Sequence, residues 1–454
     1  MASKIQFSSK IGLVAATVGS AIGLGNVWRF PAETQGNGGA AFLLLYMGCV
    51  LLLGIPVMLA EFAIGRAGRS DAIGSFRVLS PRRPWWVIGI FAVLASYLIT
   101  IFYMVVEGWT LEYLVEGLIG GLYDGIPSDA AMSEALFDSK MVELTQTPFK
   151  PALYTALVIL LNIGVLLGGV QKGIERLSNV LMPLLFVILV VLCAVSLSLP
   201  GAADGVRFFL EPDFSKLSPQ VFVNALGQAF FSLSLGMGIL ITYASYYPAS
   251  TKLPRTALIV SLLSLLVAVL MGLIIFPAVK TFGLDNNTLE GTTLVFVTLP
   301  EVFSRLPFPQ LWSTLFFSLL LVAALTSTVS ISEVAIATLQ DRLKWSRRRS
   351  VLTGLLPLLV LSLVCSLSFS TLSDIVVAGY NIFGMLDNVT TNYMLPLVAI
   401  ATCLYAGWFM PRGCLRDELC NYGSLRSHVT GITTLILRYV APLLILMIFV
   451  YNFI

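Results

Sequence analysis

Apolar stretches long enough to cross a lipid bilayer recur along the whole of this sequence. A helix needs about 20 consecutive apolar residues to span the hydrocarbon core. Hydrophobic residues make up 57% of the chain and charged residues 11%, compared with about 25% charged in soluble domains. The sequence therefore predicts an all-α integral membrane protein. We expect eleven spans, at residues 11–33, 40–65, 86–116, 152–168, 176–199, 219–247, 254–281, 310–340, 350–369, 374–407 and 430–453.

Lysine and arginine gather in loops that these spans place on one side of the membrane. Residues 66–83 and residues 342–349 are the two richest of these loops. The positive-inside rule then predicts a multi-pass protein of the plasma (cell inner) membrane, with its N-terminus in the cytoplasm and its C-terminus outside. The net charge of +3 reflects this topology, so we expect no nucleic-acid partner.

Catalytic side chains are scarce. The chain has one histidine, His428, and six cysteines that lack metal-ligand spacing. We therefore expect no enzymatic activity.

The first span contains residues that interrupt helices. The stretch "GSAIGLGNVWRFP" at 19–31 holds three glycines, an asparagine and an arginine. An unpaired backbone group in lipid costs several kcal/mol, so a helix break survives only when it is buried in protein or lines a polar cavity. Unwinding frees carbonyl oxygens, which suit a hard cation such as sodium, and amides, which suit a carboxylate. The sequence therefore predicts a site for a cation and an anionic substrate.

A second segment of the same kind lies five spans further on. "SAIGLGN" at 20–26 is echoed by "SLSLGMG" at 232–238. Small residues also allow close helix packing, which would explain either segment alone. The matched pair favours two inverted repeats with broken helices one and six, the arrangement of many transporters. We expect a single transporter domain over 1–454, with repeats at about 8–200 and 218–408 and an extra helix at about 430–454.

The motif at 19–31 resembles the first-helix signature of the neurotransmitter:sodium symporter family. Further family motifs follow in order and at family spacing: "NGGAAF" at 37–42, "EGWTLEY" at 107–113, "GQAFFSLSLGMGILITYASY" at 227–246, "LVFVTLPEVF" at 294–303 and "ALTSTVSISEVAIATLQD" at 324–341. The resemblance implies a symporter that imports a small hydrophobic amino acid with sodium by alternating access. It also implies two sodium ions.

Both sodium sites are implied by this resemblance. The first would use the carbonyl of Ala21, the side chains of Asn26 and Ser232, and the substrate carboxylate. The second would use the carbonyls of Gly19, Ile22 and Ala323 and the hydroxyls of Thr326 and Ser327. Serine and threonine in helices often bond only to their own backbone, and this alternative stays open for the two hydroxyls.

The resemblance also implies a substrate site, with the carboxylate against the amides of Leu24 and Gly25 and the hydroxyl of Tyr103. Gly23 stands where monoamine carriers have an aspartate, which favours an amino acid as substrate. The implied substrate-binding residues are Ala21, Gly23, Leu24, Gly25, Ile99, Tyr103, Phe231, Ser232, Ser234, Met237, Ser327 and Ile331. Ordinary helix packing is the alternative for each apolar member of this set.

Two charged pairs would act as gates. Arg29 lies one turn beyond the first break, where an unpaired charge is costly, and the resemblance pairs it with Asp374. On the inner side it pairs Lys4 with Asp341, where the family usually has arginine in place of Lys4. A solvated terminal charge is the alternative for Lys4.

Helix seven departs from the family pattern. Ser264 stands where an asparagine or aspartate would complete the first sodium site, and Ala268 stands where a serine or an acid would settle chloride dependence. Tyr46, Gln228 and Ser232 are compatible with a chloride site, so chloride dependence stays open.

Two other functions stay open. A proton-coupled amino-acid permease would use Glu61, Glu107 or Glu333, since intramembrane acids are functional candidates. A sensor that binds an amino acid without moving it is the other alternative. The oligomeric state and the partners beyond substrate and lipid bilayer are not predicted.

Overall fold

The structure is a computed structural model that describes residues 6–126, 130–284, 291–425 and 429–451. Within these ranges the regular structure is helical, apart from one isolated bridge between Val377 and Tyr380. The described part of the chain contains nine helices that are long and apolar enough to span a membrane. They are Ala40–Gly68 (α3, η2 and α4), Trp86–Ile119 (α6), Phe149–Leu167 (α8), Val170–Leu197 (η4 and α9), Leu253–Phe282 (α13), Pro309–Leu343 (α16), Arg347–Leu367 (α17), Ile382–Phe409 (α18, η7, α19 and η8) and Val429–Val450 (α21, η9 and α22).

Two further helical segments are interrupted at the places where the sequence predicts breaks. In the first, α1 (Lys10–Ala21) is followed by η1 (Gly25–Arg29) and α2 (Phe30–Gly36), and the two halves are bent by 52°. In the second, α11 (Pro219–Ser232) and α12 (Ile239–Ser245) are separated by six residues. The uninterrupted helices and the bent pair account for up to ten crossings. The eleventh crossing, through α11 and α12, stays a prediction.

Backbone conformation explains the second break. Ser234, Gly236 and Gly238 have positive φ angles of 54°, 78° and 71°, which a right-handed helix does not contain. A Cβ on Gly236 would also lie 2.7 Å from the carbonyl oxygen of Leu395. Glycine therefore satisfies both the backbone conformation and the close approach at this position.

The tenth span begins later than the sequence predicts. Its helix starts at Ile382 rather than at 374. Val377 and Tyr380 close a tight turn through Ala378 and Gly379, which both have positive φ. Positive φ at two consecutive turn residues is typical of a hairpin turn and is incompatible with a continuing helix. The apolar residues of this segment therefore lie in an exposed loop and not in the span.

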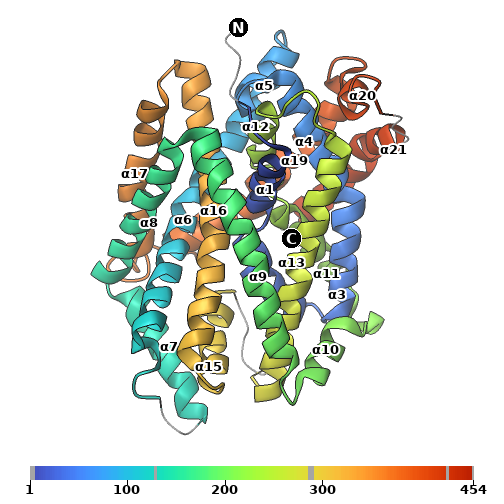
Figure 1. Cartoon of the computed structure of the whole chain (residues 1–454). Helices are drawn as coiled ribbons and strands as arrows, with labels where there is room; N and C mark the ends of the chain where they lie inside the picture. Colours follow the sequence, from blue (N-terminus) through green and yellow to red (C-terminus); the bar gives the residue numbers. More distant parts are fainter. Residues whose placement is uncertain (1–5, 127–129, 285–290, 426–428, 452–454) are drawn as a thin grey trace.

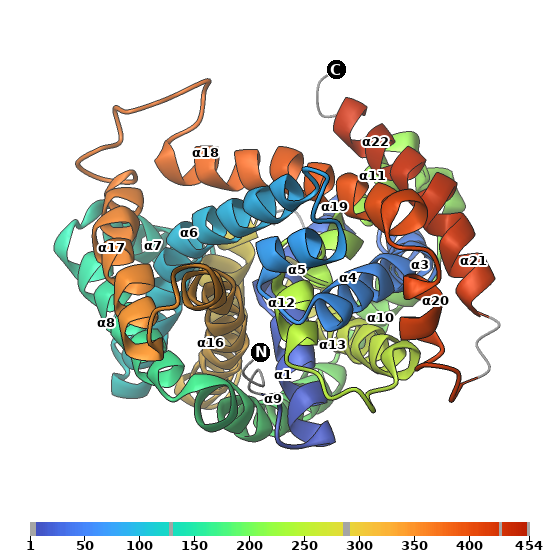
Figure 2. The ribbon, with the colours of Figure 1, turned by 90° about the horizontal axis from the view of Figure 1, so that it is seen from above.

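The long helices run roughly side by side (Figure 1), with the N-terminal end of α1, α5 (Ala72–Leu79) and α20 (Cys414–Leu419) at one end of the bundle and α7 (Ala130–Gln146), α10 (Ala202–Leu210) and α15 (Leu299–Ser304) at the other. We call these ends the N-terminal side and the α10 side. The view along the bundle shows α12 near its centre (Figure 2), where it packs against α4, α16 and α5. The two broken helices also contact each other, α11 with η1 and α2, and α12 with α1, so they meet inside the protein.

Candidate substrate and ion site

A small cavity lies between the two helix breaks. It is lined by ten residues: Ser20, Ala21, Gly23, Gly25, Tyr103, Phe231, Ser234, Met237, Ser327 and Ile331. Nine of them belong to the predicted substrate set, and Ser20 is the addition. The sequence signal for Ser20 was its place in the repeated motif "SAIGLGN". The structure thus brings most of the predicted residues to one place from α1, α6, the second break and α16.

Three predicted substrate residues lie outside this lining. Leu24 lines a larger pocket above the cavity, while Ile99 and Ser232 are buried and do not line the cavity.

The two glycines of the first break are needed because a larger residue would not fit there. A Cβ on Gly23 would lie 2.4 Å from the Ser327 hydroxyl, and one on Gly25 would lie 2.7 Å from the Phe231 ring.

The residues predicted for the first sodium site form a buried polar cluster. The Asn26 amide donates to the Ala21 carbonyl at 3.2 Å and to the Ser264 hydroxyl at 2.9 Å. Ser264 in turn donates to the Ser232 carbonyl at 3.4 Å. The Asn26 carbonyl oxygen is buried and has no hydrogen-bond partner among the described residues. A buried acceptor without a partner is rare, and it fits a hard cation that takes oxygen ligands.

The residues predicted for the second sodium site lie where α1 approaches α16. The Ser327 hydroxyl donates to the Gly19 carbonyl at 3.4 Å. Ile22 leaves the helix in an extended conformation and is fully buried. Thr326 donates to the carbonyls of Val322 and Ala323 in its own helix, as helical threonines often do. A hydroxyl that donates keeps its lone pairs, so this bond leaves the cation role possible.

Side chains of other helices pair the backbone groups that the breaks release. Gln228 donates to the Gly25 carbonyl at 2.8 Å and Ser234 to the Ser20 carbonyl at 2.7 Å. Ser96 donates to the Met237 carbonyl, and the Gly236 amide donates to Glu61 at 2.7 Å. Glu61 therefore lies at the second break. The breaks are stable in a membrane because each has partners inside the protein.

A larger pocket opens above the cavity toward the α10 side. Tyr103 and Phe231 line both spaces, with their ring centroids 6.4 Å apart. The pocket has a volume of about 620 Å³ and opens to the surface, whereas the cavity below it is much smaller. The aromatic pair therefore forms the boundary between the enclosed site and an entrance from the α10 side.

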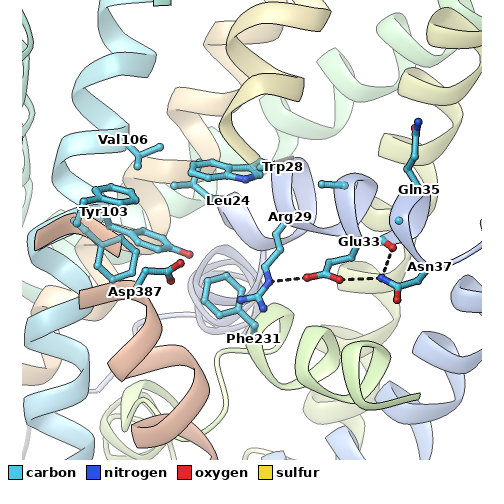
Figure 3. Close-up of a pocket in the computed structure, with 15 residues that line it drawn as sticks. Leu24, Trp28, Arg29, Glu33, Gln35, Asn37, Tyr103, Val106, Phe231 and Asp387 are labelled. Carbon is cyan, nitrogen blue, oxygen red and sulfur yellow. Dashed lines mark hydrogen bonds and ion pairs between the residues drawn. The ribbon is translucent and has the colours of Figure 1, made fainter. Parts of the chain in front are cut away.

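The entrance contains one partner of the predicted outer gate. Arg29 forms an ion pair with Glu33 at 3.6 Å, and its guanidinium lies 4.9 Å from the centre of the Phe231 ring. Asp374 lies in the exposed loop before α18 and is not among the residues that line the pocket, so the structure does not bring Arg29 and Asp374 together. Asp387, in α18, lines the same pocket, across from Arg29 and beside Tyr103 (Figure 3).

The signal for Asp387 was available in the sequence. It is an acid inside an apolar span, and such acids are functional candidates by default. The family resemblance instead points to Asp374, at the predicted start of the tenth span. The late start of α18 leaves Asp374 outside the span and Asp387 near its N-terminal end.

The N-terminal side of the cavity is closed. Phe7 is buried against the rings of Tyr243, Tyr246 and Tyr247. Behind it, Glu175 accepts hydrogen bonds from the backbone amides and the hydroxyls of Ser8 and Ser9. The described N-terminal segment therefore covers the space between α9 and α12.

The predicted inner gate is only half described. Lys4 lies outside the described residues, and Asp341 accepts a hydrogen bond from the Asp71 amide at 2.7 Å. Arg342, next in the chain, pairs with Asp71 at 3.3 Å. The pairing of Lys4 with Asp341 stays a prediction.

The remaining intramembrane acids are hydrogen-bonded. Glu333 pairs with Arg347 at 2.7 Å and accepts from the Tyr246 hydroxyl at 2.9 Å. Glu107 lies 3.4 Å from the Asn162 amide. Glu333 thus links α16 to α17, and Glu107 links α6 to α8. These contacts give both acids a structural role.

The residues considered for chloride surround Ser232. Tyr46 donates to the Ser232 hydroxyl at 2.9 Å, and the Gln228 amide is engaged with the first break. Ala268 is buried and offers no polar group. The Tyr46 hydroxyl and one N–H of the Gln228 amide thus already have acceptors, while the second N–H of that amide is available in principle, so chloride dependence stays open.

Long apolar helices, with two broken spans that meet around an enclosed cavity, define a helical membrane transporter. The model of the Sodium:neurotransmitter symporter family matches residues 4–123 and 131–454. The chain therefore belongs to the sodium:neurotransmitter symporter family, whose members are membrane transporters rather than enzymes.

Relatives and solved structures agree with this assignment. An uncharacterized sodium-dependent transporter, YhdH of Bacillus subtilis, is 37% identical over 98% of this chain and 97% of its own length. An uncharacterized sodium-dependent transporter of Haemophilus influenzae is 35% identical over the same shares. The crystal structure of MhsT in complex with L-phenylalanine is similar with a TM-score of 0.89, at 40% identity over 99% of both chains.

Proposed function

We propose that this protein is a secondary active symporter that imports a small hydrophobic amino acid together with sodium. The observation that carries the proposal is the buried cluster of Asn26, Ala21, Ser264 and Ser232 next to the cavity, with the Asn26 carbonyl oxygen left unpaired. This cluster supports a cation site in contact with the substrate space. The similarity to MhsT, whose solved structure holds L-phenylalanine, supports an amino acid as the substrate.

The lining of the cavity supports a hydrophobic side chain on that substrate. Phe231, Met237 and Ile331 supply apolar surface, and backbone amides and hydroxyls near Gly25 and Tyr103 supply the polar end. Apolar walls with a few polar groups at one end are typical of small-molecule sites. Gly23 leaves this polar end without a fixed negative charge, which favours a substrate that carries its own carboxylate.

Alternating access would start from the state that the structure describes. The α10 side is open down to Tyr103 and Phe231, and the N-terminal side is closed by Phe7 and Glu175. In the predicted topology the α10 side is extracellular, which corresponds to import. Sodium and substrate would drive transport to the extent that they bind the open and closed states with different affinities.

A proton-coupled permease is the second candidate, and Glu61 is the observation that favours it. One Glu61 oxygen accepts from Gly236, while the other is buried without a partner. A carboxyl group in this position at the second break can hold a proton as a link between helices. Glu61 would then be the proton carrier.

One experiment separates these functions. Purified protein in proteoliposomes is given radiolabelled phenylalanine, leucine or alanine under an inward sodium gradient, under potassium, and under an inward proton gradient without sodium. Accumulation only with the sodium gradient is the expected result. Accumulation driven by the proton gradient alone would replace sodium with protons, and saturable binding without accumulation would identify a sensor.

A further inference from the structure

A second hollow lies apart from the transport site, on the outer surface of the bundle. It is formed by Val87, Ile88 and Phe91 near the start of α6 and by Leu397, Val398 and Ala401 of α19. Its volume is about 510 Å³. Side chains on its rim, including Val87, Phe91 and Leu397, are 37 to 44% exposed. In a membrane protein such exposed apolar side chains face lipid. We call this hollow the Arg83 groove, after the charged residue at its mouth.

Positive charge is concentrated at the mouth of the Arg83 groove. Arg83 lines the hollow itself, and its guanidinium lies 5.8 Å from the centre of the Phe409 ring. Residues 72–86 contain three arginines and no acidic residue. Arg82 and Arg83 are both exposed, and none of the ion pairs among the described residues involves either of them. The mouth therefore offers a free guanidinium to an anion.

Aromatic residues place this mouth at the surface of the hydrocarbon core. Trp85 directly precedes α6 and Trp86 is its first residue, and the Trp85 ring packs on Phe409 at the end of η8 with centroids 4.6 Å apart. Tryptophan side chains gather at the level of the lipid headgroups. The groove runs from this level into the membrane along α6 and α19, which are in contact and lie together at the rim of the bundle (Figure 2).

We propose that the Arg83 groove binds an anionic phospholipid. An acyl chain would lie against Val87, Phe91 and Leu397, and the lipid phosphate would lie against the Arg83 guanidinium, whose planar fork matches phosphate oxygens. Free phosphate would use only the mouth and leave the apolar walls uncovered. A lipid uses both, and arginines next to a membrane attract anionic headgroups. On the predicted topology, the lipid belongs to the cytoplasmic leaflet.

Such a lipid would bridge two helices of the transport site. α6 carries Tyr103, and the helix that continues into α19 carries Asp387 at its other end. A lipid seated between the two helices would contact both of them on the membrane side. The proposal concerns binding alone, so it stands whether or not sodium proves to be the coupling ion.

Native mass spectrometry of the full chain in a neutral detergent tests the proposal. The protein is mixed in turn with phosphatidylglycerol and with phosphatidylcholine. We expect phosphatidylglycerol to be retained in preference to phosphatidylcholine, and R83Q to lower its bound fraction about fivefold or more because the charge-assisted contact is lost. Ala401→Phe, which fills the groove, should lower it as well. R348Q removes an exposed arginine of another loop and is the matched control, expected to bind like the parent protein.

Three results would overturn the proposal. Equal retention of the two lipids would show that the groove does not distinguish an anionic headgroup from a zwitterionic one. Unchanged phosphatidylglycerol binding in R83Q, which alters only an exposed side chain and leaves the fold intact, would place the lipid elsewhere. Full displacement of the bound lipid by millimolar inorganic phosphate would show an anion site that does not use the apolar groove.

Discussion

At the scale of single residues, the site depends on close packing around two glycines and on one buried oxygen that can accept a ligand. Gly23 and Gly25 leave space that any Cβ would fill. The Asn26 carbonyl oxygen is buried and unpaired, so it is the atom most in need of a ligand. Both features can be tested by small substitutions that leave the helices intact.

Gly23→Ala should abolish most substrate binding. The added Cβ would lie 2.4 Å from the Ser327 hydroxyl, and overpacking of this kind costs about 1–3 kcal/mol. We expect a loss of roughly tenfold or more in the affinity for radiolabelled phenylalanine in an equilibrium binding assay. Gly48→Ala, where a Cβ meets nothing within 4 Å, is the control. Equal affinity in the two variants would remove Gly23 from the site.

Asn26→Ala should raise the sodium concentration needed for half-maximal substrate binding. Losing a ligand to a charged group costs about 2 kcal/mol, which corresponds to about a 30-fold change. Thr326→Ala should act in the same direction. Ser362→Ala removes a buried hydroxyl of α17 and should leave the sodium dependence unchanged. A sodium titration identical to that of the parent protein in both site variants would contradict the assignment.

The sequence predicted this level of detail unevenly. The predicted residues Asn26, Ser232 and Ser264 lie together in the structure. Asn26 and Ser232 stand at the edges of the two breaks, where the glycine-rich motifs mark their positions, and Ser264 lies inside the regular helix α13. The start of the tenth span was predicted too early because Ile375, Val376 and Val377 look like the beginning of a span. Their apolar side chains are exposed in a loop, and the turn at Ala378 and Gly379 depends on φ angles that composition does not reveal.

At the scale of elements, polar contacts hold the N-terminal segment and the short helix α20 against the long helices. Glu175, in η4, accepts the hydrogen bonds of Ser8 and Ser9 just before α1 begins. Arg66, near the end of α4, pairs with Glu418 of α20, and each side chain is 2% exposed. The first contact closes the N-terminal side, and the second joins α4 to the segment before the last span.

Glu175→Ala should loosen the N-terminal segment. Four hydrogen bonds lose their acceptor, and each contributes about 1 kcal/mol. We expect the amides of Ser8 and Ser9 to exchange their hydrogens about tenfold faster or more in mass-spectrometric exchange measurements. Glu211→Gln, an exposed acid near α10, is the control. Exchange rates equal to those of the parent protein would show that Phe7 alone holds the segment.

Arg66→Ala should destabilise the protein strongly. Removing one partner of a buried ion pair leaves the other charge uncompensated, which costs about 3–5 kcal/mol. The midpoint of thermal unfolding in detergent should fall clearly, while Arg412→Ala, at an exposed position, should change it little. The double variant Arg66→Met with Glu418→Leu should recover much of the loss, since two apolar side chains leave no buried charge. A double variant as unstable as Arg66→Ala would contradict this explanation.

At the scale of the whole molecule, the structure is open on one side only. The entrance lies on the α10 side above Tyr103 and Phe231, whereas Phe7 and three tyrosines close the N-terminal side. Sequence motifs predicted both gates as charged pairs. They did not predict which gate is open, because that depends on the relative positions of helices and not on the identity of residues.

A cysteine probe can report this asymmetry. In a protein whose native cysteines are replaced, Ala32→Cys at the entrance should react with a charged thiol reagent in sodium. Phenylalanine and sodium together should slow that reaction about tenfold if they favour a closed state. Tyr247→Cys, at a fully buried position, is the control and should stay unreactive in the sodium-bound state. Equal labelling of both positions would contradict the one-sided opening.

The hydrogen bonds across the helix breaks also constrain how the chain enters the membrane. Gly25 finds its partner in Gln228, which follows 203 residues later, and Ser20 finds its partner in Ser234. At a synthesis rate of about 5–20 residues per second, the later partner emerges roughly 10–40 s after the earlier one. During that interval the first span cannot have its final hydrogen bonds. Either it crosses the bilayer as an unbroken helix and unwinds later, or the insertion machinery shelters it until the sixth span arrives.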